Sequence, residues 1–286
     1  MEYRTLINTS THCIYEAFSQ AFADYQVSVD MPLESFEIML KRNGYMPEIS
    51  AGAFDDGVLV GFVLNGVRVW DGEKTIYDLG TGVIPTFRRK GITENLLNLV
   101  KELCQKNNIG AYQLEVIQTN EGAVALYQKQ GFQAKRALNC YSLEGNLAEP
   151  LENTKLKLHR PQEIETEQWE LLKRFWNYSP SWQNGIDSVC AIPDTFGYTL
   201  AESEGTLIGY GIVQKANGDI VQLAVDPQYR RKGVATEILL DLQKQTKKSR
   251  MSAINVDERD EAANSFLKRM GFNIFVTQYE MVKSLR

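Results

Sequence analysis

The spacing of apolar residues predicts a succession of short strands and amphipathic helices in the first half of the chain. Ile14, Phe18 and Phe22 recur at helical spacing, and the strands at 50–55 and 58–69 are joined across the turn-forming Asp55-Asp56-Gly57. The predicted order is a strand at 2–7, helices at 11–24 and 33–43, strands at 50–55, 58–69 and 75–84, a helix at 91–107, a strand at 111–119, a helix at 121–130 and a strand at 136–143.

The second half repeats this order. Hairpin strands come first and alternation with helices comes later, which predicts an α+β (mixed α/β) sheet in each half. The predicted elements are strands at 155–158, 197–203, 206–215 and 218–225, a helix at 233–247, a strand at 252–257, a helix at 260–270 and a strand at 274–282.

A basic turn that contains glycine occurs once in each half, at Phe87–Thr93 and Tyr229–Ala235. Each copy follows an apolar strand and opens a leucine-rich helix, so its backbone N–H groups and the helix dipole would face an anion. The glycine lets the backbone approach a phosphate closely. The turn is not a P-loop, and Gly80-Thr81-Gly82 lacks the third glycine of a dinucleotide fingerprint because Pro85 stands there.

A second repeated segment follows each turn, at Asn120–Phe132 and Asp260–Phe272. The turns are offset by 142 residues and the later glycines by 140, a period far longer than that of a solenoid. The duplication therefore predicts tandem domains. The polar, Gly- and Pro-containing stretch between the halves places the domains at 1–146 and 154–286.

Together these motifs resemble the GNAT superfamily of acyl-CoA-dependent N-acetyltransferases. The turns are similar to its pyrophosphate-binding motif, [Arg/Gln]-x-x-Gly-x-[Gly/Ala], and Asn120–Phe132 is similar to its later Asn-x-x-Ala-x-x-Leu-Tyr-x-x-x-Gly-Phe motif. The resemblance implies two GNAT folds, each a mixed, mostly antiparallel splayed sheet flanked by helices. It also implies acetyl-CoA as the acyl donor. The residues expected to bind it are Val83, Arg88, Arg89, Lys90, Gly91, Ile92, Thr93 and Asn120 in the first copy, and Val225, Arg230, Arg231, Lys232, Gly233, Val234 and Ala235 in the second.

The expected reaction is direct attack of a primary amine, from a small molecule or a peptide, on the acetyl thioester. Positioning of the two reactants would supply much of the rate, and a phenol at Tyr127 would protonate the departing thiolate. The base that deprotonates the amine is open among Asp78, Glu115 and water. Packing without chemistry is the alternative for Tyr127, and ordinary ion pairing for the two carboxylates.

The two copies differ where chemistry is expected. The first has Thr93 where the family has Gly or Ala; the second has Asp260 for Asn and Leu267 for Tyr, and leucine cannot donate a proton. The first domain is therefore predicted to be catalytic and the second degenerate in catalysis. The alternatives are turnover in the second domain and a non-catalytic acyl-CoA-binding sensor.

Composition narrows the remaining classes. A net charge of -5 disfavours a nucleic-acid partner, and no segment approaches the roughly 18 apolar residues of a membrane span. The four cysteines are scattered without a zinc-binding pattern, which predicts no metal and reduced thiols in the cytoplasm. The chain is expected to act as a monomer with an internal pseudo-dimer or as a homodimer.

Overall fold

The chain forms two compact units in the computed structural model, which describes residues 1–24, 31–147 and 156–286. The first unit contains residues 1–116, 122–135 and 280–286, and the second contains 117–121 and 136–279. Each unit thus draws on both halves of the sequence. The predicted domain boundary at 147–153 lies almost wholly outside the described residues.

The first unit is built on a mostly antiparallel sheet that opens at one place. Strands β1 (Glu2–Thr5), β2 (Ala51–Asp55), β3 (Val58–Trp70) and β4 (Glu73–Val83) pair antiparallel in that order. Strand β5 (Ala111–Ile117) runs parallel to β4, but the two pair only where 75–77 face 111–113. Beyond this point β4 and β5 diverge, as the splayed sheet predicted from the sequence requires.

A β-bulge in β4 lies beside this opening. Leu64 of β3 faces Gly80, whereas the next residue, Asn65, faces Asp78, so Leu79 is the extra residue. A bulge kinks its strand and re-aims the neighbouring side chains. Asp78 therefore sits directly before the kink, at the place where the sheet opens.

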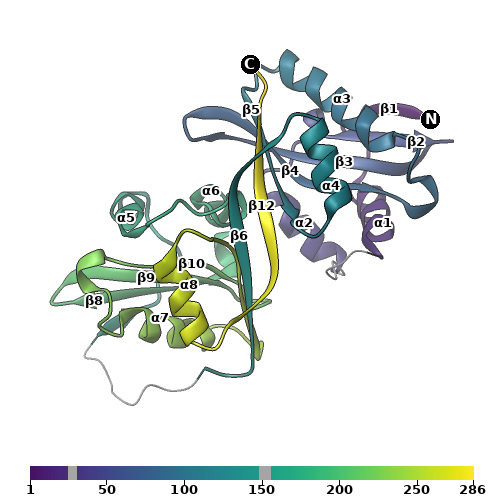
Figure 1. Cartoon of the computed structure of the whole chain (residues 1–286). Helices are drawn as coiled ribbons and strands as arrows, with labels where there is room; N and C mark the ends of the chain where they lie inside the picture. Colours follow the sequence, from purple (N-terminus) through teal and green to yellow (C-terminus); the bar gives the residue numbers. More distant parts are fainter. Residues whose placement is uncertain (25–30, 148–155) are drawn as a thin grey trace. The chain divides into compact units, whose positions relative to one another are not determined.

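Helices α1 (Thr11–Phe22), α2 (Leu33–Arg42), α3 (Ile92–Lys106) and α4 (Glu121–Lys129) accompany this sheet (Figure 1). Ser10 caps α1, because its hydroxyl accepts a hydrogen bond from the Cys13 amide at 3.2 Å. The apolar face of α1 buries Phe18 against Phe62, with ring centroids 5.9 Å apart. The helical spacing that predicted α1 is thus the spacing of its buried face.

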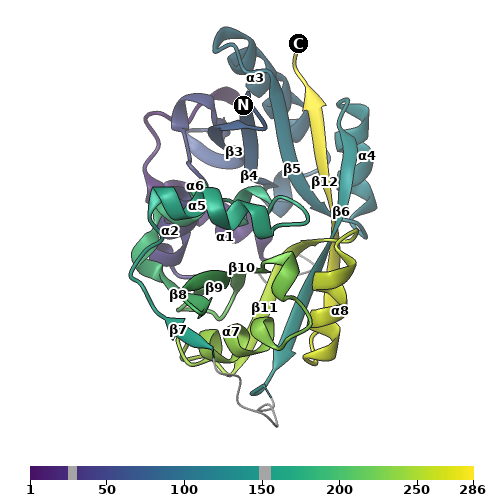
Figure 2. The same cartoon turned by 90° about the vertical axis from the view of Figure 1, so that its left-hand side faces the viewer.

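The second unit repeats the arrangement. Strands β7 (Lys157–His159), β8 (Phe196–Ser203), β9 (Thr206–Gln214) and β10 (Ile220–Val225) form an antiparallel sheet, and α7 (Val234–Gln243) packs on β8 and β9 (Figure 2). Strand β11 (Arg250–Asp257) pairs antiparallel with β6 (Gln133–Glu144). Helices α5 (Thr166–Leu172), α6 (Ile186–Ala191) and α8 (Glu261–Arg269) complete the unit.

The last strand of each sequence half belongs to the unit of the other half. Residues 136–144 of β6 lie in the second unit, whereas the end of β12 (Asn273–Ser284) lies in the first. There the Leu285 amide donates to the Gly110 carbonyl at 2.8 Å, and the yellow end of β12 lies beside β5 (Figure 1). Each sheet is thus completed by a strand from the opposite half.

The predicted fold class is confirmed: each unit is a mixed, mostly antiparallel sheet flanked by helices. Most elements lie within a few residues of their predicted positions. The helix predicted at 233–247 is shorter than expected, because α7 ends at Gln243. Helices α5 and α6 were not predicted.

Candidate active site

The two basic turns have the same backbone conformation. Arg89 and Gly91 adopt left-handed φ angles of 62° and 73°, and Arg231 and Gly233 adopt 64° and 82°. Left-handed residues in such a turn direct successive amides toward one point and form a concave anion site. The two copies therefore share a backbone suited to a phosphate.

Each turn leads into a helix whose first amides precede any helical hydrogen bond. Gly91 is the N-cap of α3 and carries no side chain that could cap it, unlike Ser10 of α1. The first helical bond runs from the Asn95 amide to the Gly91 carbonyl, so the amides of Ile92 and Thr93 lie before it. In α7 the corresponding bond runs from Glu237 to Gly233, which leaves the amides of Val234 and Ala235. Such amides bind anions.

The first arginine of each turn donates hydrogen bonds to residues outside the turn, within its own unit. The Arg88 Nε donates to the Val83 carbonyl at 3.1 Å, while its terminal nitrogens donate to Asp24 at 2.6 and 2.7 Å and to the Ala21 carbonyl at 2.9 Å. The hydrogen bonding of Arg88 to Asp24 holds the pKa of the Asp24 carboxyl below its ordinary value. Arg88 thus fastens the end of α1 to the end of β4.

Arg230 makes the equivalent contacts with one difference. It donates to the carbonyls of Val225 at 2.9 Å and Phe175 at 2.8 Å, and to the side-chain oxygen of Asn177 at 2.9 Å. The partner of Arg88 is a carboxylate, whereas that of Arg230 is a neutral amide. Asn177 therefore leaves the positive charge of Arg230 in place, whereas Asp24 offsets that of Arg88.

The remaining basic residues of the turns face outward. Arg89, Lys90, Arg231 and Lys232 are exposed. The Lys90 ammonium lies 4.9 Å from the centre of the Phe87 ring, and Lys232 lies 5.0 Å from that of Tyr229. These side chains are available to an anion at the turn.

The structure brings together the two predicted catalytic residues of the first unit. Tyr127 and Asp78 are each 8% exposed, and the Tyr127 hydroxyl donates a hydrogen bond to the Asp78 carboxylate. Asp78 also accepts from the Gly80 amide at 2.9 Å and the Thr81 hydroxyl at 2.6 Å. Burial raises the pKa of Asp78 to about 6, against the opposing effect of these hydrogen bonds.

Two further polar residues, which the sequence did not single out, extend this cluster. The Tyr112 hydroxyl donates to the Asn65 side-chain oxygen at 2.9 Å, and Asn65 faces Asp78 across β3 and β4. Burial, and then the charge of Asp78, raise the pKa of Tyr112 above its ordinary value. The Phe132 ring makes edge contacts with Tyr112 and Tyr127 at centroid distances of 5.1 and 5.6 Å. We call Asn65, Asp78, Tyr112 and Tyr127 the polar cluster.

The other carboxylate considered as a base, Glu115, lies on the opposite face of the sheet. Tyr77 precedes Asp78 on β4, and successive strand residues point to opposite faces. The Tyr77 hydroxyl donates a hydrogen bond to Glu115. Asp78 therefore accompanies Tyr127 on one face, and Glu115 accompanies Tyr77 on the other.

In the second unit, apolar residues occupy the positions of the polar cluster. In β10, Val225 faces Gly209 of β9, just as Val83 of β4 faces Gly61 of β3. Both β10 and β4 have a bulge at the same distance before this pair, so the residues five positions earlier, Ile220 and Asp78, are equivalent. Val213 faces Ile220 and so corresponds to Asn65. The bridge between Asp219 and Ser252 matches the pairing of Tyr77 with Gln113, which aligns Met251 with Tyr112.

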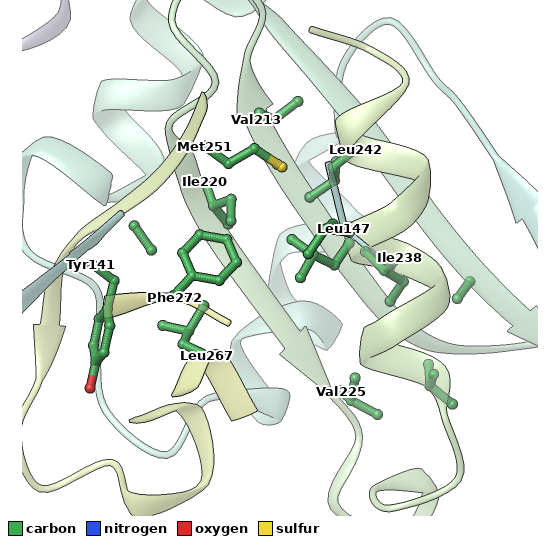
Figure 3. Close-up of a cluster of buried hydrophobic side chains, with 14 of the residues drawn as sticks. Tyr141, Leu147, Val213, Ile220, Val225, Ile238, Leu242, Met251, Leu267 and Phe272 are labelled. Atoms are coloured by element: carbon green, nitrogen blue, oxygen red, sulfur yellow. The ribbon is translucent and has the colours of Figure 1, made fainter. Parts of the chain in front are cut away.

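The motif aligns Leu267 with Tyr127 and Phe272 with Phe132. Figure 3 shows Ile220, Met251 and Leu267 gathered around the Phe272 ring, within one buried apolar cluster that also contains Val213. The later motif of the second copy thus contributes to a hydrophobic core. Asp260, which replaces Asn120, caps α8 by accepting from the Ala263 amide at 3.1 Å.

The second unit nevertheless contains a cavity of about 1000 Å³. It extends from the turn at Arg230 and Gly233 along β10 to β11, where those two strands diverge. The aromatic segment before α6 also lines it, through Trp176 and Tyr178. A cavity of this size accommodates an elongated small molecule.

Other features bear on the predicted classes. Within residues 1–24, 31–147 and 156–286, no cluster of acidic, histidine or cysteine side chains is arranged to hold a metal ion. No helix in this described part combines the length and apolar character needed to cross a bilayer. Cys13, Cys104, Cys140 and Cys190 are all free thiols.

Known proteins match both halves of the chain. The model of the acetyltransferase (GNAT) family matches residues 12–132 and 158–272. Two solved structures reach a TM-score of 0.76 at 15% identity: a tandem GNAT protein from the clavulanic acid biosynthesis pathway, covering 100% of this chain and 98% of that one, and a GCN5-related N-acetyltransferase from Sphaerobacter thermophilus, covering 100% and 96%.

A curated relative matches a shorter stretch. N-alpha-acetyltransferase 50 of Danio rerio is 32% identical over 87 residues, which are 30% of this chain and 52% of the relative. The chain thus spans about half the length of that protein. Since the family model covers most of both sequence halves, this chain belongs to the GNAT family of acetyltransferases.

Proposed function

We propose that the first unit transfers the acetyl group of acetyl-CoA to a primary amine. The observation that carries this proposal is the buried pair of Tyr127 and Asp78 beside the opening between β4 and β5. A phenol held by a carboxylate at this place is suited to proton transfer. The turn at Gly91 would hold the diphosphate through the amides of Ile92 and Thr93.

In the proposed reaction the amine nitrogen attacks the thioester carbon directly. The new C–N bond forms as the C–S bond breaks, and the Tyr127 hydroxyl gives its proton to the departing thiolate. Asp78 accepts the hydrogen bond that orients the hydroxyl, and so acts as a positioning residue for the acid. The backbone around Val83 would contact the pantetheine arm, and the proton lost by the amine passes to Glu115 or to water.

The acceptor is an amine of a small molecule or a peptide. The relative in Danio rerio is by name an N-alpha-acetyltransferase, which supports an α-amine. The tandem relative comes from the clavulanic acid biosynthesis pathway, but at 15% identity its likeness is evidence of fold alone and does not bear on the acceptor.

The second unit has a different candidate function, favoured by its own cavity. Ile220 and Leu267 provide no acid or base, yet the turn at Arg230 and Gly233 keeps the anion-binding backbone and lines a cavity of about 1000 Å³. We propose that this unit binds acyl-CoA without turning it over, as a sensor or a stabilising module.

The test compares matched substitutions in the two turns. Purified protein would receive acetyl-CoA and a panel of small amines, peptides and aminoglycosides, and CoA release would be followed. Gly91→Glu places a carboxylate beside the diphosphate and should abolish release, whereas Gly233→Glu should leave it and remove one of two coenzyme sites in calorimetry. Release that survives Gly91→Glu and stops with Gly233→Glu would transfer the activity to the second unit.

A further inference from the structure

A short exposed segment borders the cavity of the second unit, between two buried aromatic residues. Phe175 and Trp182 are buried, whereas residues 177–179 between them are exposed. Residues 175–180 all line the cavity. We call residues 176–180 the strap. Because burial fixes the chain on both sides of the strap, a local opening would involve only these few residues.

The side chain of Asn177 links the two sides of the cavity. Its oxygen accepts from the Arg230 guanidinium at 2.9 Å, and its nitrogen donates to the Asp260 carboxylate at 2.9 Å. Arg230 belongs to the turn after β10, and Asp260 is the N-cap of α8, which follows β11. Strands β10 and β11 bridge near their first residues, at Asp219 and Ser252. The Asn177 side chain therefore lies across the space between the last residues of the two strands.

Two further contacts hold the strap in this position. The Ser179 carbonyl accepts from the Arg136 guanidinium at 2.8 Å, and the Arg259 guanidinium lies 4.7 Å from the centre of the Tyr178 ring. A single hydrogen bond, or a cation over an exposed aromatic ring, makes only a small net contribution to stability in water. The strap is thus closed by a few weak contacts, and Asn177 makes two of them.

The link uses a residue at which the coenzyme is expected. Asp260 has the position of Asn120, which is expected to bind the coenzyme in the first copy. In the second copy one carboxylate oxygen of Asp260 accepts both from the Ala263 amide and from Asn177. A pantetheine arm that ran from the turn amide of Val234 into the cavity would pass between the ends of β10 and β11. The closed link occupies that passage.

The first copy has a different residue at the corresponding arginine. Arg88 donates to the carboxylate of Asp24, as Arg230 donates to the amide oxygen of Asn177. An ionised carboxylate accepts hydrogen bonds but cannot donate one. A link that depends on a donated amide hydrogen therefore requires the asparagine of the second copy.

We infer that the strap closes the cavity of the second unit and that a coenzyme must displace it to bind. The inference rests on the proposed binding of acyl-CoA by this unit, and it describes how that binding is regulated. The apparent affinity equals the intrinsic affinity reduced by the fraction of molecules whose strap is open. A bound coenzyme in turn holds the strap open, because it binds only the open state.

The experiment isolates the second site in the full chain by adding Gly91→Glu, which removes the first. Calorimetry would give the Kd for CoA, and surface plasmon resonance would give the association rate. Asn177→Ala should lower the Kd about three- to tenfold, mainly through faster association, because the link no longer competes with the coenzyme. Asn273→Ala, at an exposed asparagine that begins β12, is the matched control and should change neither quantity.

Hydrogen exchange reports on the strap directly. Exchange of a peptide spanning residues 174–182 would be followed in the same Gly91→Glu protein with and without CoA. Asn177→Ala should speed exchange in the strap without the coenzyme, and CoA should speed it in the protein that retains Asn177. A ligand that merely covered a fixed wall would slow this exchange, so the sign of the change separates the two cases.

The outcomes separate the closing strap from coenzyme binding itself. If Asn177→Ala changed neither Kd nor association rate while one CoA still bound per chain, the strap would have no such role and binding would stand. Slower exchange of residues 174–182 on addition of CoA would also overturn it. If the Gly91→Glu chain bound no CoA with or without Asn177→Ala, coenzyme binding by the second unit would be refuted, and the inference with it. Circular dichroism and melting temperature would show that each variant folds.

Discussion

The two units have residues of opposite character at equivalent positions. In the first unit, the positions around Phe132 hold the polar cluster with its buried carboxylate at Asp78. In the second, the equivalent positions around Phe272 hold four apolar residues packed in a core (Figure 3). Buried polar groups cost stability unless every partner is in place. The first unit therefore retains an arrangement that folding alone does not favour.

This difference locates function more sharply than the motifs alone. Both units keep the left-handed turn and its free helix amides, so the anion site does not distinguish them. The distinction lies in the side chains where the sheet opens: Asp78 and Tyr127 against Ile220 and Leu267. Under the proposed function, coenzyme binding would be shared by both copies, whereas the chemistry would belong to the first alone.

The largest expected effect tests the acid directly. Tyr127→Phe should lower kcat for CoA release about a hundredfold or more while leaving coenzyme affinity unchanged, because only the proton donor is removed. Leu267→Met, a volume-conserving change at the equivalent position, is the control and should leave kcat unchanged. A Tyr127→Phe enzyme with full activity would end the assignment of general acid to this residue.

The buried carboxylate predicts a pH-dependent stability difference. The folded pKa of Asp78, about 6, exceeds the ordinary 3.8, so its stabilising contribution is complete below 3.8 and is lost as pH rises through 6. Asp78→Asn should therefore raise the free energy of unfolding by up to about 3 kcal/mol above pH 7, and by much less near pH 4.

Chemical denaturation of both proteins from pH 4.5 to 8 measures this difference, with exposed Glu102→Gln as the control. If the difference in unfolding free energy between the Asp78→Asn variant and the unsubstituted protein stayed constant across that pH range, Asp78 would not titrate within it.

Converting the polar pair into its apolar counterpart sharpens the comparison further. Tyr127→Leu alone deprives Asp78 of a donor and should cost about 1–3 kcal/mol of unfolding free energy. Adding Asp78→Ile should recover much of that loss while activity stays absent, since the pair then matches Leu267 and Ile220. Denaturation of both single variants and the double variant gives the coupling energy, and strictly additive costs would argue against a shared contact.

The smallest expected effect concerns the partner of the turn arginine. Asp24→Asn gives Arg88 a neutral partner, as Asn177 does for Arg230. Coenzyme affinity of the first unit should rise about two- to fivefold at low salt and return toward the original value at high salt. Calorimetry at two salt concentrations measures this, and a salt-independent change would point to altered packing.

The spacing of apolar residues and the turn-forming residues were sufficient to predict most helices, strands and turns. The helical spacing of Ile14 and Phe18, the turn at Asp55–Gly57 and the two glycine turns all lie in the elements they predicted. Helix α7 ends at Gln243, earlier than predicted, and the polar residues at 244–247 include no Gly or Pro that would have marked its end in the sequence. Segments α5 and α6 were missed because each is shorter than two helical turns.

Tertiary pairing was beyond the reach of the sequence. Asp78 and Tyr127 were each considered, but nothing local shows that a bulge aims the carboxylate at the phenol. Strand β12 neighbours β5 in the sheet, and periodicity cannot indicate a partner so far along the chain. Comparison of the two copies was the signal available: polar residues in one half that are apolar in the other mark Asn65 and Tyr112.

The crossed strands have a consequence for biosynthesis. The first unit needs residues 280–286, so a ribosome that has translated only the first half releases a sheet still lacking its final strand. That edge stays open for pairing until residues 280–286 have been made, and aggregation with other nascent chains is the competing outcome until then. A stop codon after Tyr279 would therefore damage the first unit, although most of that unit is encoded in the first half of the gene.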